Sequence, residues 1–360
     1  MLRAIVIDDL KRRGGGQSYA KVTGEVLKKM GYDTYFLTNV DYVDERIGKI
    51  AYRVGYDFRE NSSNFTNFFK IVKLRQQLKR IDIEKFDISI NNHPNVFIIK
   101  GKMNILHGFL FLEPWIDERG EIVNYLPLRI FKFTKLYEVY DSSLFIPNSK
   151  YTKEISTKLF KEIGLQTEIG MILHPPVDVK LTQIKEKKRQ VLLLGRISPH
   201  KGLGEAISIA KKNSFRIVIA GYINKGDESF VKKMMKDKSE NIKIMTNVSE
   251  DEKTRLMNES STILSLNKKE NFGIAIAEAM GHGCVPVVPK SGGHWNDILE
   301  CGKYGIGYND GESLERSIYQ SFDYNIEERM KISSSIERFS VSQFQKKLRE
   351  LVEIINANRN

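Results

Sequence analysis

Cysteine, long apolar runs and the usual metal-binding motifs are scarce or absent in this sequence. Its two cysteines, Cys284 and Cys301, show no metal or redox spacing, so we expect a reduced, cytoplasmic compartment. No uninterrupted apolar run approaches the roughly 18 residues that a membrane-spanning helix needs, which predicts no transmembrane segment. Residues 1–9 are too short and become acidic too soon for a signal peptide, and they predict a first strand instead.

Common nucleotide- and nucleic-acid-binding signatures are also missing. The chain has no G-x-G-x-x-G stretch, no P-loop, and no helix–turn–helix, zinc or RNA-binding fingerprint. Its charge is nevertheless strongly positive, because 57 basic against 45 acidic residues give a formal net charge of +12. This excess favours polyanionic partners, namely nucleotide diphosphates, anionic membranes or nucleic acid, although a generally basic surface would give the same count.

The length of 360 residues is natural for two domains, and the first half opens as a doubly wound α/β domain. A strand, a glycine loop, a helix and a second strand are expected at 3–8, 11–18, 18–30 and 34–38, before a polar, irregular stretch at 40–60. Gly14, Gly15 and Gly16 would let the backbone approach a ligand closely. A flexible, solvated basic loop is an equally good interpretation.

Two histidines lie just past the ends of predicted strands. His93 follows the strand at 86–90, and His107 follows the strand at 103–106. Open α/β sheets bind ligands at these carboxyl ends. His107, which precedes a glycine, is the better catalytic candidate, whereas His93 precedes Pro94 and could simply shape a turn. A lone histidine is more often structural than catalytic, so that interpretation stays open.

Residues 65–81 predict a basic amphipathic helix. Apolar residues recur there at helical spacing, with lysines and arginines between them. Such a helix could dock on an anionic membrane surface, or it could be an ordinary surface helix with its apolar face on the core. Binding of the purified protein to anionic liposomes would separate the two interpretations.

The second half repeats the strand–loop–helix pattern after a lysine-rich linker at 180–189. Its first strand, 190–195, is a continuous apolar run, as in buried parallel strands. Arg196 and Lys201 stand on the loop that follows, and both can reach one diphosphate, Arg as a planar fork and Lys as a mobile point charge. A basic, solvated turn is the alternative.

The stretch from Glu270 to Met280 contains two carboxylates around an Asn-Phe-Gly turn and an Ala/Ile-rich helical run. A helix starting near Gly273 would leave Glu270 above its N-terminus and place Glu278 in its second turn. Free N–H groups and the positive end of the helix dipole would then face an anion such as a diphosphate. Alone, the stretch also fits a buried helix with an acidic start. With a glycine turn at 291–293, three loops open to one edge of the predicted sheet.

These motifs together resemble the GT-B glycosyltransferases, specifically glycosyltransferase family 4. The resemblance rests on Gly195-Arg196 with Lys201-Gly202, Glu270-Asn271-Phe272-Gly273 with Glu278-Ala279-Met280, Gly283 to Val288, and Ser291-Gly292-Gly293. It covers about residues 190–300, while the first half matches in its glycine loop, strand-end histidines and layout. The Asn-Phe-Gly-Ile run followed by Pro-Lys-Ser-Gly-Gly looks most like the mannosyltransferases that extend dolichol-linked oligosaccharides, whose donor is GDP-mannose.

The resemblance implies an α/β GT-B fold, with two Rossmann-like parallel-sheet domains facing across a cleft. We expect an acceptor-binding domain at 1–182 and a nucleotide-sugar-binding domain at 183–340. A C-terminal helix at 341–360 would pack back toward the first domain.

The resemblance also implies roles for residues of the second half. Arg196 and Lys201 would bind the donor diphosphate. Glu270 would contact the sugar on the face where transfer occurs, and Glu278 would hydrogen-bond the ribose hydroxyls. The amides of Asn271, Phe272 and Gly273 would hold sugar or phosphate oxygens.

In the first half, the resemblance places His107 near the anomeric carbon and the acceptor. Gly15 and Gly16 correspond to the loop that closes on the phosphate. These assignments divide the predicted site between the two halves of the chain.

The implied enzyme is a retaining hexosyltransferase, with mannose favoured, that needs no cofactor and no metal. Its donor would be a nucleotide-diphosphate sugar, GDP-mannose before a UDP-sugar, and its acceptor a glycan or a polyprenyl-linked glycan. The chain has no Asp-x-Asp triplet and no histidine–carboxylate cluster of metal-ligand spacing. Cationic side chains and helix-terminal amides could instead stabilise the leaving diphosphate. Such an enzyme of glycan biosynthesis would act in the cytoplasm or peripherally at the cytoplasmic face of a membrane.

Two other functions stay open. A nucleotide-sugar epimerase or a sugar phosphorylase of GT-B type would share the architecture; an epimerase would make product from donor alone, and a phosphorylase would need a phosphate or pyridoxal site. A non-enzymatic nucleic-acid-binding protein would fit the charge of +12 but lacks a recognisable fingerprint, so we expect no nucleic acid partner.

Overall fold

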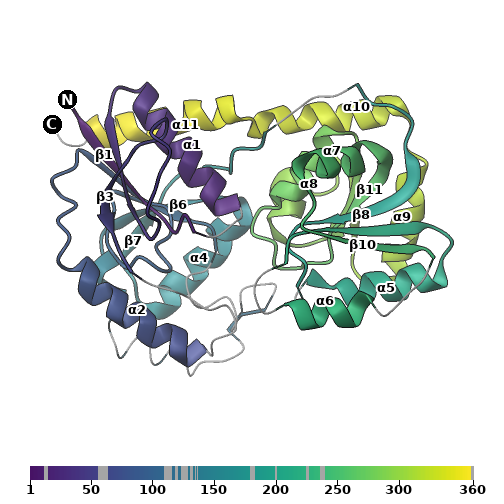
Figure 1. Ribbon diagram of the computed structural model, residues 1–360, viewed down its shortest axis with the longest axis horizontal. Coiled ribbons are helices and arrows are strands. Elements are labelled where there is room, and N and C mark those ends of the chain that lie inside the picture. The colour runs from purple at the N-terminus through teal and green to yellow at the C-terminus, as the bar shows by residue number, and fades with distance from the viewer. Residues whose placement is uncertain are drawn as a thin grey trace. The chain divides into compact units, whose positions relative to one another are not determined.

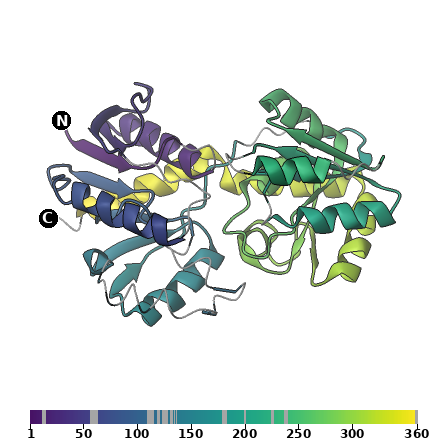
Figure 2. The same cartoon turned by 60° about the horizontal axis from the view of Figure 1, so that its bottom comes forward.

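The computed structural model describes most of the chain, except residues 12–14, 56–63, 109–115, 118–120, 123–128, 130–132, 134, 136, 179–182, 199–200, 224–226, 236–239 and 358–360. The side chains of residues 15–17 and 64–69 are likewise not described, and the predicted loop residue Gly14 lies outside the described residues. The chain forms two compact units, Met1–Pro176 with Val341–Asn360, and Val177–Ser340 (Figure 1). Both ends of the chain belong to the first unit (Figure 2).

The described residues of the first unit form a sheet of seven parallel strands in the order β3-β2-β1-β4-β5-β6-β7. The strands are β1 (Arg3–Ile7), β2 (Asp33–Thr38), β3 (Lys49–Arg53), β4 (Ile88–Asn91), β5 (Met103–Leu106), β6 (Ser143–Pro147) and β7 (Thr167–Ile169). The stretch expected to be irregular, 40–60, contains β3. This strand lies at the sheet edge and buries none of its residues fully, which explains its weak apolar pattern.

Helical segments connect several of these strands. They are α1 (Gly15–Lys29), α2 (Asn64–Leu78), the short 3-10 helix η2 (Glu138–Tyr140) and α4 (Lys150–Ile163). Ser149 caps α4, because its side chain accepts a hydrogen bond from the amide of Thr152. Helix α1 begins earlier than the start predicted near Ser18, so Gly15 and Gly16 form its first turn rather than a loop.

Helix α2 packs its described apolar side chains on the core. Ile71, Leu74 and Leu78 are all buried, as expected of an ordinary surface helix. Membrane binding by residues 65–81 stays a prediction. Over the described residues, no helix is both long enough and apolar enough to cross a membrane.

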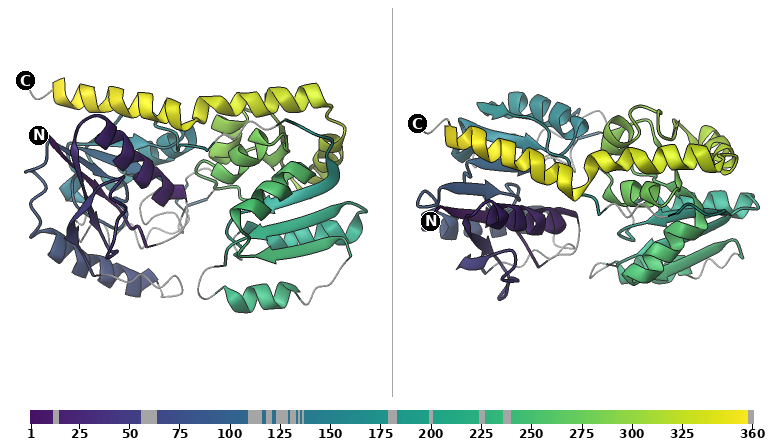
Figure 3. Two further views of the ribbon diagram at one scale, coloured as in Figure 1. Left: turned by 45° about the horizontal axis from the view of Figure 1, so that its top comes forward. Right: turned by 90° about the horizontal axis from the view of Figure 1, so that it is seen from above.

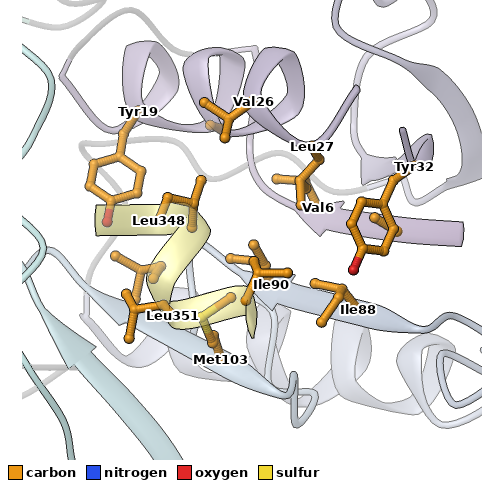
Figure 4. Packing of buried hydrophobic residues seen from close by; sticks show 14 of the residues in the cluster. Val6, Tyr19, Val26, Leu27, Tyr32, Ile88, Ile90, Met103, Leu348 and Leu351 are labelled. Carbon is orange, nitrogen blue, oxygen red and sulfur yellow. The ribbon is translucent and has the colours of Figure 1, made fainter. Parts of the chain in front are cut away.

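The last helix of the described chain, α11 (Val341–Ala357), completes the core of the first unit. Figure 3 shows α11, in yellow, running beside α1. Its buried residues Phe344, Leu348 and Leu351 pack with side chains from α1 and from the sheet (Figure 4). The ring of Phe344 meets Tyr19 of α1 edge-on at 4.8 Å between centroids.

The described part of the second unit forms six parallel strands in the order β10-β9-β8-β11-β12-β13. They are β8 (Lys188–Leu194), β9 (Arg216–Gly221), β10 (Ile242–Thr246), β11 (Ser260–Leu264), β12 (Val285–Pro289) and β13 (Ile306–Tyr308). Val191 and Leu192 of β8 are fully buried and belong to different core clusters. Helices therefore cover both faces of this sheet, as the continuous apolar run predicted.

The helical segments of this unit are α5 (Leu203–Lys212), α6 (Glu228–Met235), α7 (Glu250–Glu259), α8 (Ile274–Gly281), the π-helix η4 (His294–Ile298), α9 (Gly311–Phe322), α10 (Ile326–Ser334) and the 3-10 helix η5 (Ser335–Phe339). The unit begins at Val177, before the boundary expected after residue 182. Val177 is fully buried in the second core, and its amide donates to the carbonyl of Phe339 at 2.9 Å. These contacts assign it to the second unit.

Each sheet has one position where the strand order reverses direction, between β1 and β4 in the first unit and between β8 and β11 in the second. Loops leaving neighbouring strands there diverge to opposite faces and leave room for a ligand. The sequence places His93 after β4, and it places Arg196, Lys201 and Glu270 on the loops after β8 and β11. The topology therefore brings Arg196, Lys201 and Glu270 to the reversal of the second sheet, while in the first sheet His107 follows β5, the neighbour of β4.

We predict that Leu348→Ala destabilises the protein, because Leu348 is only 1% exposed in the core of the first unit. Truncating a buried leucine typically lowers the free energy of unfolding by about 2–5 kcal/mol. Ile354→Ala on the same helix is the matched control, since Ile354 is 50% exposed and its loss should change stability by less than about 0.5 kcal/mol. Calorimetric unfolding of both variants measures the difference, and equal stabilities would contradict this role of α11.

Candidate functional site

An ion pair joins the two loops at the strand-order reversal of the second unit. β8 leads to Lys201 and β11 leads to Glu270, and the two strands are parallel neighbours. Their loops therefore leave the same edge of the sheet. Lys201 Nζ lies 2.8 Å from Glu270 Oε2, and both side chains are partly buried, with 33% and 23% exposed.

Glu270 is held at three points. Besides Lys201, the side chain of Asn267 donates to Glu270 Oε2 at 3.1 Å, and the amide of Gly293 donates to the Glu270 carbonyl at 2.6 Å. Burial alone would raise the pKa of Glu270, but the charge of Lys201, assisted by His294 and by the hydrogen bonds, outweighs it and lowers the pKa. Glu270 is therefore a carboxylate at neutral pH.

Two glycines allow the loops to meet this closely. Gly273 has φ of +105°, in the left-handed region, and caps the N-terminus of α8. A Cβ atom at Gly293 would lie 2.1 Å from the carbonyl oxygen of Asn271, so only glycine fits there. Ser291 adds a further link, donating its hydroxyl to the Lys268 carbonyl at 2.9 Å. The glycine turn at 291–293 is thus clamped to the Glu270 loop.

The turn between Glu270 and α8 places main-chain amides beside the ion pair. Helix α8 begins at Ile274, and no side chain of its N-cap residue, Gly273, accepts a hydrogen bond from the N–H groups of its first turn. Phe272 has a structural side chain, because it is 2% exposed and packs against Phe339 at 5.1 Å between ring centroids. Asn271, Phe272 and Gly273 can therefore offer main-chain groups to an anion at this helix end.

Glu278 lies further along α8 and has a different partner. Lys253 Nζ is 3.5 Å from Glu278 Oε2 and 2.6 Å from Glu250 Oε2. Burial raises the pKa of Glu278; Lys253 opposes this effect, whereas Glu250 adds to it. The two carboxylates of the sequence motif thus have opposite pKa shifts.

Arg196 lies on the loop that leaves β8, between the strand end at Leu194 and Lys201, and it is half-buried. The structure thus places Arg196 at the same sheet edge as the Lys201–Glu270 pair. Its guanidinium is the second cation that the sequence predicted there.

Sequence reasoning missed His294 and Asn267. His294 is fully buried; burial lowers its pKa to about 4, and nearby Glu270 offsets only part of this effect. The amide of Trp295 donates to His294 Nδ1 at 3.0 Å, so the neutral ring carries its proton on Nε2. His294 follows the Gly-Gly pair directly, and this adjacency was the available signal.

The first unit has its own polar cluster at its strand-order reversal. His107 Nε2 lies 2.9 Å from Asn92 Oδ1, and the Asn92 amide donates to Asp8 Oδ2 at 2.6 Å. Burial, with a smaller effect of His93, lowers the pKa of His107 to about 3. His93 shapes a turn, since its carbonyl accepts from two later amides, and its Nδ1 also lies 3.3 Å from Asp8 Oδ1.

Gly15 and Gly16 stand at the N-terminus of α1, where the first main-chain amides of a helix have no intrahelical acceptor. No group of three or more His, Cys, Asp or Glu side chains that could hold a metal ion occurs among the described residues. Metal independence stays a prediction.

We predict that Lys201→Met raises the pKa of Glu270. Without the ammonium, burial becomes the dominant influence and favours the neutral carboxyl. In the native pair the lowered pKa stabilises the fold above the ordinary value of 4.5, and this contribution is lost as the pH falls through the lowered value. A carbon-detected NMR titration of the glutamate carboxyls, assigned with Glu270→Gln, measures the change.

Lys253→Met is the matched control for this titration. It should raise the pKa of Glu278 further and leave that of Glu270 unchanged, because Lys253 pairs with Glu278. An unchanged Glu270 pKa in Lys201→Met would show that the pair does not hold the carboxylate ionised.

The second unit matches a known family. Residues 178–339 match the family described as glycosyl transferases group 1. Two curated relatives are named GDP-Man:Man(3)GlcNAc(2)-PP-Dol alpha-1,2-mannosyltransferase. The Dictyostelium discoideum protein is 24% identical over 59% of this chain and 48% of its own length, and the Mus musculus protein is 27% identical over 57% and 47%. The chain spans about half the length of these relatives.

Solved structures resemble the fold of the whole chain. Anabaena HepE in complex with UDP and glucose has a TM-score of 0.68 at 16% identity, covering 98% of this chain and 100% of HepE. Sucrose-phosphate synthase from Thermosynechococcus elongatus has a TM-score of 0.76 at 13% identity, covering 99% and 100%. With two parallel-sheet α/β units, this chain has the GT-B fold, and its residues 178–339 match the glycosyl transferases group 1 family.

Proposed function

We propose that the chain is a retaining, metal-independent glycosyltransferase that moves a hexose from a nucleotide-diphosphate sugar to a glycan or lipid-linked acceptor. The Lys201–Glu270 pair carries this proposal. It joins a cation and an ionised carboxylate at the strand-order reversal and the α8 N-terminus, within the segment that matches the family. A leaving diphosphate and an electron-poor sugar carbon need these two charges side by side.

The cations and amides stabilise the leaving diphosphate. Breaking the bond between the anomeric carbon and the phosphate oxygen develops negative charge on the diphosphate. Lys201, Arg196 and the amides at the start of α8 supply positive potential there, and Gly15 and Gly16 of α1 supply amides from the first unit. We assign the ribose hydroxyls of the donor to Glu278, whose half-buried carboxyl can accept their hydrogen bonds.

Glu270 stabilises and orients the sugar. Its lowered pKa keeps it charged, so it can stabilise the oxocarbenium-like sugar as the old bond breaks. The acceptor oxygen attacks from the same face, its proton passes to the departing phosphate oxygen, and the anomeric configuration is retained. In this front-face reaction Glu270 orients and stabilises the sugar without forming a bond to it. His107 would lie near the anomeric carbon and the acceptor.

Mannose is the favoured sugar and GDP-mannose the favoured donor. The relatives from Dictyostelium discoideum and Mus musculus are named as GDP-mannose enzymes acting on a dolichol-linked glycan, which also suggests a polyprenyl-linked acceptor and a cytoplasmic or membrane-peripheral location. A UDP-sugar is the alternative donor, because a structure of similar fold contains UDP and glucose.

We predict that GDP-mannose raises the melting temperature more than UDP- or ADP-sugars do. A donor at 100 times its Kd stabilises the folded state by about 2.7 kcal/mol. Lys201→Ala should weaken donor binding by about 10- to 100-fold, because a charged hydrogen bond to the diphosphate is lost. Lys212→Ala removes an exposed lysine at the far end of α5 and should bind like the wild type. A larger rise in melting temperature with a UDP-sugar would indicate that the donor is a UDP-sugar rather than GDP-mannose.

We predict that Glu270→Ala lowers the rate of sugar transfer by at least about 10²–10³-fold, as for the loss of one preorganised charge at a reacting centre. Radiolabelled GDP-mannose and a lipid-linked glycan acceptor measure the rate, and circular dichroism checks the fold. An assay with donor alone identifies an epimerase by its product, and an assay with phosphate identifies a phosphorylase. Full transfer activity in Glu270→Ala would show that Glu270 has no role in sugar transfer.

A further inference from the structure

A continuous chain of hydrogen bonds in the first unit connects a buried carboxylate to His107. Asp8, Asn92 and His107 follow β1, β4 and β5, three neighbouring strands of the sheet. We propose that Asp8 is a positioning residue that acts through Asn92 to fix the proton of His107 on Nε2, leaving Nδ1 as an acceptor for a substrate hydroxyl. Only the last step, contact with the substrate, rests on the proposed function.

The direction of each hydrogen bond follows from the chemistry of the groups. An ionised carboxylate can only accept, so the Asn92 group 2.6 Å from Asp8 Oδ2 must be its NH₂. The Asn92 oxygen then faces His107 Nε2 at 2.9 Å, and because this oxygen can only accept, Nε2 must donate. Turning the Asn92 amide over would set its oxygen against the carboxylate. The charge of Asp8 therefore locks the orientation of Asn92.

The remaining ring nitrogen is left with a lone pair. A neutral imidazole has one proton, and burial holds the pKa of His107 down at about 3, so the ring is neutral near pH 7. Within the described part of the chain, Nδ1 of His107 has no hydrogen-bond partner. Tyr19 packs edge-on against the ring at 4.7 Å between centroids, which restrains its plane. The result is a fixed acceptor at the carboxyl edge of the sheet.

The environment of Asp8 supports a dedicated role. Its side chain is 1% exposed, and burying a carboxylate is expensive unless hydrogen bonds satisfy it. Its carboxylate also lies 3.3 Å from His93 Nδ1. The adjacent Asp9 is equally buried, at 2%, but it bonds the side chain of Asn39 and the amide of Lys11 instead. Of these two neighbouring acids, Asp8 is the one linked to His107.

The low pKa also decides what His107 does with a substrate. A ring that resists protonation is a weak base near neutral pH. His107 therefore holds a hydroxyl through an O–H···Nδ1 hydrogen bond and does not remove its proton. This contact would orient the sugar or the acceptor for transfer. It would also discriminate against substrates that lack that hydroxyl, because Nδ1 would stay unpaired.

The experiment is a measurement of the histidine tautomers by ¹⁵N NMR. The chain has six histidines, and His107→Gln assigns the His107 signals by their loss. We expect wild-type His107 to carry its proton on Nε2. Asp8→Asn removes the charge that locks Asn92, so the tautomer should shift toward Nδ1–H or a mixture. Asp9→Asn, which removes the neighbouring buried charge, should leave the His107 signals unchanged.

Two results would overturn the proposal. One is a wild-type His107 protonated on Nδ1, which needs no variant and so holds even where Asp8→Asn fails to fold. The other is an unchanged tautomer in folded Asp8→Asn. Asn92→Leu gives an independent check. It removes the acceptor of Nε2–H, so the His107 tautomer should again shift toward Nδ1–H or a mixture.

Kinetics then separate this proposal from the proposed function. By analogy with the outer partners of metal-bound histidines, Asp8→Asn should lower kcat/KM by about 10- to 100-fold. A tautomer that shifts as expected in a protein without transferase activity would reject the proposed function and keep the Asp8–Asn92–His107 link. Normal transfer in Asp8→Asn, despite a shifted tautomer, would reject the role of Nδ1 toward the substrate.

Discussion

Parallel strand pairing at the two strand-order reversals is the constraint on which the candidate site depends. β8 lies beside β11 and β1 beside β4, and since each pair is parallel, the loops after them leave the same edge. A residue pair distant in sequence, such as Lys201 and Glu270, can thereby approach to 2.8 Å. Without this pairing, the polar groups of each unit would be scattered over separate loops.

Each unit holds a carboxylate at this position, partly buried at Glu270 and fully buried at Asp8, and the two are held by different means. Glu270 is paired with the cation of Lys201 and has a lowered pKa, so it stays negatively charged beside a positive charge. Asp8 accepts hydrogen bonds from an amide and lies near an imidazole, and its charge orients neighbours. The arrangement at Glu270 is suited to stabilising a charge that develops on a substrate. The arrangement at Asp8 is suited to aligning the side chains of Asn92 and His107.

Much of the fold was predictable because its central strands, such as β4, β5, β11 and β12, are buried on both faces and therefore have strong apolar patterns. β3 was not, since an edge strand with no fully buried residue lacks such a pattern. The turn at Glu270 and the helix after it were predictable from local sequence, and the GT-B architecture was predictable from the order of motifs. The start of α1 was placed too late because glycines usually indicate loops.

The partners within the site could not be predicted. The pairs Lys201–Glu270 and Lys253–Glu278 depend on which strands are neighbours, and His294 lies beside Glu270 only because the glycine turn folds onto that loop. Opposite pKa shifts at Glu270 and Glu278, two residues of one motif, arise from these tertiary contacts. Likewise, no sequence pattern connects Asp8 to Asn92 or Asn92 to His107.

Helix α11 has a consequence for the order of assembly during synthesis. The first unit is interrupted in sequence, because Val177–Ser340 is inserted before the helix that supplies Phe344, Leu348 and Leu351. A nascent chain leaves the ribosome from its N-terminus, so the second unit has all its core residues before the first does. Until α11 emerges, the apolar faces of α1 and of the sheet beneath it stay uncovered. The half of the protein that is made first is therefore the half that finishes folding last.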